Sequence, residues 1–206
     1  MKSRIFFLFL FVNSLLSAQK ADTIIRNSIY ESHYSFKYKN PIYVKYKLYK
    51  GGGDCNRSQF KFKVDSIKNT ASDNDYIASG YDRGHLANTE DFAYDCSKTE
   101  VTFRFYNCIP QTPKLNRGIW KSYESKIRKI SQTDSLLIVC GGIFENRHTE
   151  VSKLPVPTFC WKIVKSLSTG NIIYALLFTN EMETSSVKKM PIEQLIKQLG
   201  YNPLEP

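Results

Sequence analysis

The sequence has no internal repeat, no low-complexity block and no apolar run long enough to cross a bilayer comfortably. It contains three histidines, which stand far apart, and none of its five cysteines forms a C-x-x-C pair. A structural zinc site is therefore poorly supported. These absences argue against a membrane-spanning protein, a repeat protein and a zinc module. They favour one globular domain.

The N-terminus is typical of an export signal. Lys2 and Arg4 precede an apolar run over residues 5–16, and the small residues Ser17 and Ala18 follow it. This pattern predicts a signal peptide over residues 1–18, cleaved after Ala18, and a mature domain over residues 19–206. A membrane anchor is the alternative. We expect a secreted or periplasmic protein without stable membrane association.

The chain is strongly basic, with a formal net charge of +10. Removing Lys2 and Arg4 with the signal peptide takes away two positive charges and no negative ones, so the balance falls from +10 to +8. Such a charge attracts polyanions. Lysines alternate with aromatic residues over 37–50 and 61–68, which is typical of a nucleic-acid surface and also of the solvent side of half-buried strands.

Cysteine usage allows disulfides in an exported protein. The number of cysteines is odd, so at least one thiol stays free or pairs with another molecule. Spacing does not reveal the pairing. The cysteines are Cys55, Cys96, Cys108, Cys140 and Cys160.

Hydrophobic patterning predicts an α+β fold: a single domain with a mostly antiparallel central sheet. An edge or half-buried strand is expected over 41–49, and 73–80 is expected to be a polar loop. Further strands are predicted over 101–106 and 135–140, and a hairpin joins 160–164 to 172–178. Helices are expected over 115–130 and 191–199, the second between Pro191 and Gly200.

Three short motifs together describe a phosphodiesterase site. They are D-R-G-H at residues 82–85, N-x-x-P-Q at 107–111 and L-N-x-G-x-W-x-x-x-E at 115–124. Hydrolysis of a phosphodiester needs a base for water and a cation on the phosphate oxygens. His85 suits the first task, because a neutral imidazole is a good base near neutral pH, and the amide oxygen of Asn116 is a hard ligand suited to magnesium.

In the order and spacing of these motifs, the sequence resembles the DNA/RNA non-specific endonucleases, the ββα-metal nucleases of the secreted bacterial and endonuclease G type. The resemblance extends more loosely from about residue 41 to the C-terminus. It implies a ββα-metal finger core and hydrolysis of DNA and RNA with little sequence preference. It also implies Mg²⁺ as cofactor, with Mn²⁺ as a substitute, and it is compatible with a homodimer.

The resemblance assigns roles to the motif residues. His85 would activate water, Asn116 would bind the metal directly, and Glu124 would hold the hydrated cation through water. Asn107 would position the scissile phosphate and the base, although asparagine is also a common cap or turn residue. Glu124 is also spaced to form an i,i+4 surface pair with Arg128, and both interpretations can hold together.

Arg83 and Arg57 resemble the phosphate-binding arginines of that family, and Arg128 is a further candidate; planar guanidinium groups neutralise phosphoryl oxygens well. Arg83 lies inside the first motif. The assignment of Arg57 rests on a loose R-x-x-F-x-F pattern, and a solvated surface position is an equal alternative for this residue. Arg128 lies one turn beyond Glu124 and would reach the substrate backbone.

Departures from the family pattern are limited. Asn88 stands where family members usually have proline, and it would loosen the turn after His85. Cys108 lies within the second motif, where a disulfide would brace Asn107. His148, near Glu145 and Glu150, is expected in a solvated loop rather than in a second metal site.

Two alternatives remain from the sequence. The first is a catalytically silent, basic nucleic-acid-binding protein with the same fold, against which the retention of His85, Asn116 and Glu124 argues. The second is a toxin nuclease with a dedicated inhibitor. No delivery module supports it.

Overall fold

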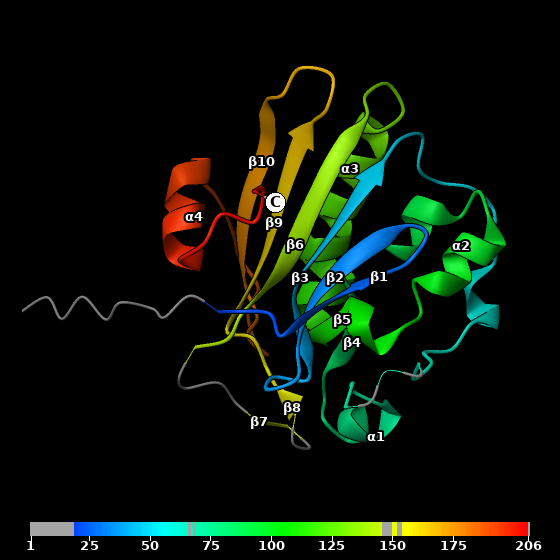
Figure 1. Cartoon of the computed structure of the whole chain (residues 1–206), viewed down its shortest axis with the longest axis vertical. Helices are drawn as coiled ribbons and strands as arrows, with labels where there is room; N and C mark the ends of the chain where they lie inside the picture. The colour runs from blue at the N-terminus through cyan, green and yellow to red at the C-terminus, as the bar shows by residue number, and fades with distance from the viewer. Residues whose placement is uncertain (1–18, 66, 68, 146–149, 152–153, 206) are drawn as a thin grey trace, which may run out of the picture.

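A seven-stranded antiparallel sheet forms the centre of the computed structural model, which describes residues 19–65, 67, 69–145, 150–151 and 154–205. Its strand order is β1-β2-β3-β6-β9-β10-β11 (Figure 1). The strands are β1 (Thr23–Arg26), β2 (Tyr30–Ser35), β3 (Asn40–Leu48), β6 (Leu136–Ile143), β9 (Phe159–Ser166), β10 (Ile172–Thr179) and β11 (Val187–Lys189).

The two faces of the sheet pack against different helices, because buried residues alternate along its central strands. On one face, Val44 and Ile138 share a core with Ile127 of helix α3 (Lys121–Ile130), which crosses behind the sheet in Figure 1. On the other face, Trp161 packs with Leu195 of helix α4 (Ile192–Leu199). The candidate site residues lie on the α3 side.

A small hairpin-like sheet and α3 make a ββα finger beside the main sheet. Strand β4 (Asp82–His85) pairs antiparallel with β5 (Cys108–Gln111), so His85 lies opposite Cys108. The connection between them contains 3₁₀ turns η2 (Thr89–Phe92) and η3 (Phe105–Asn107) and helix α2 (Cys96–Val101). Other short elements are η1 (Arg57–Gln59), α1 (Asp73–Tyr76), β7 (Glu150–Val151) and β8 (Leu154–Pro155).

The predicted fold class is confirmed, as are most predicted elements. Strand 135–140 is the start of β6, and the predicted hairpin is β9 and β10. Strand 41–49 corresponds to β3, which is half-buried and lies inside the sheet rather than at its edge. Helix α4 begins after Pro191 and ends at Gly200, whose φ of 75° is the left-handed conformation that glycine adopts without strain.

Two expectations were wrong because local hydrogen bonding overrides the hydrophobic pattern. The predicted strand 101–106 is instead the end of α2 followed by η3, since Asp95 caps α2 by accepting from the backbone N–H groups of Ser97 and Lys98. The predicted loop 73–80 contains α1, which begins with a capping box between Ser72 and Asp75.

The helix predicted over 115–130 forms, but it is divided. A π-helical turn, η4 (Leu115–Trp120), precedes α3, and Gly118 has the non-helical angles φ −104° and ψ −110°. A straight helix would separate Asn116 and Glu124 by about 12 Å along its axis. The kink at Gly118 changes this spacing, and both side chains line one cleft.

The predicted signal peptide, residues 1–18, and His148 lie outside the described residues. Within the described part of the chain, no helix is both long enough and apolar enough to span a bilayer.

Candidate active site

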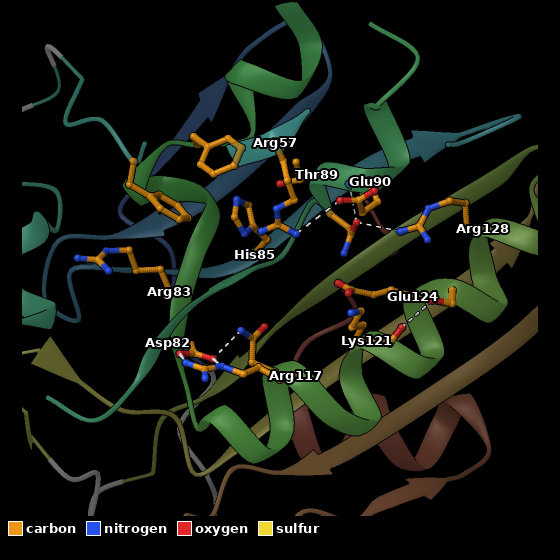
Figure 2. A pocket seen from close by; sticks show the side chains of 15 residues that line it. Arg57, Asp82, Arg83, His85, Thr89, Glu90, Arg117, Lys121, Glu124 and Arg128 are labelled. Carbon is orange, nitrogen blue, oxygen red and sulfur yellow. Dashed lines mark hydrogen bonds and ion pairs between the residues drawn. The ribbon is translucent and has the colours of Figure 1, made fainter. Parts of the chain in front are cut away.

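The ββα finger opens into a cleft of about 750 Å³ that gathers most of the predicted site residues. Figure 2 shows Arg57 beside His85, with Glu124 and Arg128 both carried by α3. His85 and Asn116 therefore share one cleft. Its walls are Arg57, Phe62, Asp82, Arg83, His85, Asn88, Thr89, Glu90, Phe103, Asn116, Arg117, Lys121, Glu124, Ser125 and Arg128.

Two aromatic rings hold His85 in place at the end of β4. Its ring centroid lies 4.7 Å from that of Phe62 and 4.9 Å from that of Phe103. The side chain is 8% exposed, and its Nε2 atom is buried without a hydrogen-bond partner among the described residues. Desolvation, with a smaller contribution from Arg57, lowers the pKa of His85 to about 3. The imidazole is therefore neutral at physiological pH.

Two of the predicted motifs meet across the β4–β5 pair. Gly84 pairs with Ile109, and a Cβ atom at Gly84 would overlap the side chain of Gln111, two residues further along β5. A glycine is needed there because of this close approach. The D-R-G-H and N-x-x-P-Q motifs are thus two halves of one packed unit.

Asn107 is not among the residues that line the cleft. It is fully buried: its Oδ1 accepts from the backbone N–H of Ala87, and its Nδ2 donates to the carbonyls of Ala87 and Thr102. Its own backbone carbonyl accepts from the N–H of Leu86. Both Nδ2 hydrogens are thus donated to backbone carbonyls. It holds the chain that follows His85.

Asp82 orients Asn116. The Nδ2 of Asn116 donates to Asp82 Oδ2 at 2.9 Å, and Arg117 donates to both carboxylate oxygens, at 2.8 and 2.6 Å. Burial raises the pKa of Asp82, but the hydrogen bonds from Arg117 and Asn116 outweigh it, and the net pKa is lowered. Because the amide nitrogen of Asn116 donates to the Asp82 carboxylate, the amide oxygen is the atom of this side chain that can bind a metal ion.

Glu124 is buried beside a lysine that the sequence did not suggest. The side chain of Glu124 is 8% exposed, and its Oε1 lies 3.7 Å from Lys162 Nζ, which is itself 4.1 Å from the ring centroid of Trp120. Oε1 has no hydrogen bond in the described part of the chain. Lys162 is 1% exposed. Removing either partner would leave the other buried without its counter-ion.

The surface pair expected between Glu124 and Arg128 is replaced by other contacts. Arg128 Nε lies 3.1 Å from Asp91 Oδ1, and its Nη2 donates to Asn88 Oδ1 at 3.0 Å. Burial raises the pKa of Asp91 to about 6, against the opposite effect of Arg128. Asn88 also caps η2, so it braces the turn after His85 rather than loosening it.

The other two predicted arginines also line the cleft. Arg57 lies 3.7 Å from Glu90 and is half exposed. Arg83 lies over the ring of Tyr76 and forms an ion pair with Asp73 at 2.5 Å. Any phosphate that Arg83 binds must therefore compete with a carboxylate.

A disulfide between Cys55 and Cys96 fastens the segment that carries Arg57. Beside it, Gly53 has a φ of 132°, and a Cβ atom there would overlap the backbone of Ala93. The backbone N–H of Cys55 donates to the Ala93 carbonyl at 3.0 Å. The bridge expected at Cys108 does not form, because that thiol is free and buried.

Sequence reasoning missed several residues of this site. Arg117 and Lys121 add positive charge one and five positions after Asn116, and Asp82 belonged to a motif but received no role. Lys162 had one sequence signal, a charged residue within an apolar strand.

The oxygen donors fit a hydrated divalent cation. The Asn116 amide oxygen and the Glu124 carboxylate face the same cleft, and both are hard ligands. Although Glu124 Oε1 lies 3.7 Å from Lys162 Nζ, it makes no hydrogen bond to the described residues, so the carboxylate can still accept one from a cation-bound water.

Comparison with solved structures defines the class of fold. The crystal structure of an EndoG/EndoGI complex, described as showing a mechanism of EndoG inhibition, matches with a TM-score of 0.75. The match covers 86% of this chain and 83% of the other, at 22% identity, which shows a shared fold. The architecture is that of the ββα-metal nucleases.

The family follows from the sequence comparisons. The profile of the DNA/RNA non-specific endonuclease family matches residues 11–204, and this chain belongs to that family. A nuclease of Nostoc sp. is 30% identical over 141 residues, which are 62% of this chain and 52% of the relative. Mitochondrial endonuclease G of Bos taurus is 32% identical over 160 residues, 70% of this chain and 51% of the relative. The chain thus spans about half the length of these curated relatives.

Proposed function

We propose that this chain is a metal-dependent endonuclease that hydrolyses phosphodiester bonds in DNA and RNA with little sequence preference. One observation carries the proposal: the neutral imidazole of His85 lines the same cleft as Asn116 and Glu124, whose oxygen atoms can bind a cation. Arginines line the cleft as well. Family membership and the nuclease relatives support it.

His85 would act as the general base. The neutral ring accepts the proton of the attacking water without first having to lose one. Since Nε2 is covered by protein, we assign the proton transfer to the other ring nitrogen, Nδ1. Phe62 and Phe103 keep the ring desolvated and aimed into the cleft.

Asn116 and Glu124 would hold the cation, Asn116 through its amide oxygen and Glu124 through bound water. We propose Mg²⁺, with Mn²⁺ as a substitute. When bound, the cation would stabilise charge on the phosphoryl and leaving oxygens. Asp82 keeps the nitrogen of Asn116 away from the cation by accepting its hydrogen bond.

Arg57, Arg83 and Arg128 would bind the phosphates that flank the scissile bond. Contacts to phosphate oxygens position a nucleic acid but carry no base information, which accounts for weak sequence preference. Arg128 is held by Asp91 with its guanidinium at the cleft, so it is preorganised for this task.

We also propose that the protein is exported, with residues 1–18 as the signal peptide, and that the mature chain is secreted or periplasmic. The Cys55–Cys96 disulfide supports this location, because disulfides persist mainly in oxidising compartments. The homodimer stays a prediction, which sedimentation of the mature chain would test.

Digestion of plasmid DNA and of RNA tests the activity. The wild-type chain should degrade both with Mg²⁺ and neither with a chelator, and His85→Ala should lose at least about 100-fold in rate. His33→Ala is a matched control, because His33 lies on β2, stacks on Tyr43 and is not part of the cleft. A wild-type chain that retards both substrates in a gel but leaves them intact would instead support the silent binding protein.

A further inference from the structure

A second cavity, of about 530 Å³, lies at a corner of the main sheet, and we call it the corner groove. Strand β2 begins at Tyr30, opposite Tyr46, so β3 continues beyond its neighbour and leaves Lys47 without a β2 partner. Residues of the β1–β2 turn and of the segment that leads into α2 form the two walls; Figure 1 shows where these two segments lie. A hydrogen bond from the Tyr30 hydroxyl to the Val101 carbonyl, 3.2 Å, joins these walls.

The corner groove is basic. Four of its lining residues are cations and one, Glu31, is a carboxylate; the cations are Arg26, Lys45, Lys47 and Lys98. Glu31 is already engaged with Arg26 at 3.5 Å and His33 at 3.2 Å. Within the described residues, Lys45 and Lys47 have no ion-pair partner. Their positive charge is available to an anionic ligand.

An exposed aromatic ring lies among these cations. Tyr94 is 52% exposed, and Lys98 Nζ is 4.8 Å from its ring centroid. An aromatic face beside lysines suits a nucleic-acid strand, because bases stack on the ring while ammonium groups contact the phosphates. A simple inorganic anion would use the lysines and leave the ring unused.

The corner groove and the active-site cleft lie along one short segment of chain. Asn88, Thr89 and Glu90 line the cleft, and Phe92, Tyr94 and Lys98 line the groove. The disulfide at Cys96 ties this segment to the arm that carries Arg57. The shared wall is therefore braced by a covalent link between the two sites.

We propose that the corner groove binds the backbone of the same nucleic-acid substrate at phosphates beyond those in the cleft. This inference rests on the proposed function and deepens it, since it makes long polymers better substrates than short oligonucleotides. A substrate confined to the cleft gains nothing from the groove. A longer one gains affinity from each lysine contact through counterion release.

The test compares two double variants of equal net charge. Lys47→Gln/Lys98→Gln removes two groove cations, and Lys188→Gln/Lys189→Gln removes two from β11, at the opposite edge of the sheet. Binding is measured with chelator present, by fluorescence anisotropy over a salt series, on duplexes of about 8 and about 40 base pairs. Hydrolysis of the short duplex is measured separately with Mg²⁺.

If each lysine contacts one phosphate, the groove variant should lower the salt slope on the long duplex by about 1.8 and its affinity by about 30-fold near 0.15 M salt. The short duplex should bind and be cleaved as by wild type. Equal losses in the groove and control variants, or equal losses on short and long duplexes, would overturn the proposal. An absence of cleavage by wild type would overturn the proposed function but leave this binding comparison interpretable.

Discussion

Lowering the pH from 7 to 5 should destabilise the wild-type chain by about 2 kcal/mol relative to His85→Asn. The pKa of His85 falls to about 3 in the folded chain, against about 6.5 for an unperturbed histidine. Below pH 6.5, residue 85 of the unfolded chain therefore binds a proton, whereas His85 of the folded chain stays neutral. The free energy of unfolding therefore decreases as the pH falls. Between pH 7 and 5 this uptake favours the unfolded chain by about 2 kcal/mol, and the loss continues towards pH 3.

Urea unfolding of both proteins at the two pH values gives this difference directly. The other histidines and all carboxylates are common to both proteins, so their titrations cancel. A wild-type-to-variant gap in unfolding free energy that is the same at pH 7 and pH 5 would refute the reasoning. It would mean that the ring titrates normally in the folded chain and is not held as a neutral base.

Three further predictions concern the groups around the base. Asp82→Asn releases the amide of Asn116 and should weaken Mn²⁺ binding, measured by calorimetry, by about 10- to 100-fold, and unchanged affinity would count against the orienting contact. Cys55→Ser opens a disulfide with a sequence separation of 41 residues and should cost about 4 kcal/mol in urea unfolding, an effect that reductant should reproduce in wild type. Lys162→Met leaves Glu124 buried without its partner and should lower the free energy of unfolding by about 3 to 5 kcal/mol. A second substitution, Glu124→Gln, should restore part of this stability, and no recovery would show that the broken ion pair is not the cause.

The sequence predicted those parts of the site that depend on short spacings. His85, Asn116 and Glu124 lie within motifs whose internal geometry is set by a strand or a helix, and the structure brings all three to one cleft. Likewise, a continuous apolar run predicted β6 and helical periodicity predicted α4, because a buried strand and an amphipathic helix each impose a clear pattern.

Contacts between distant segments were beyond such reasoning. The Lys162–Glu124 pair joins residues of β9 and α3, and no local pattern relates them. The alternation over 101–106 suggested a strand, yet Phe103 and Phe105 are buried by packing around a turn near His85 and Phe62. Two buried aromatic residues with one residue between them are compatible with either arrangement, so the alternation alone did not distinguish a strand from the turn η3.

The buried amide of Asn107 changes how inactive variants at that position should be interpreted. Its hydrogen bonds to the backbone of Ala87 join the two halves of the ββα finger just after His85. The position of the imidazole therefore depends on these bonds. We expect a substitution at Asn107 to displace the base even though this buried side chain does not line the cleft. Loss of activity in an Asn107 variant would therefore reflect a displaced His85. If the substrate-binding surface were mapped from inactive variants alone, Asn107 would be included in it although this residue does not line the cleft.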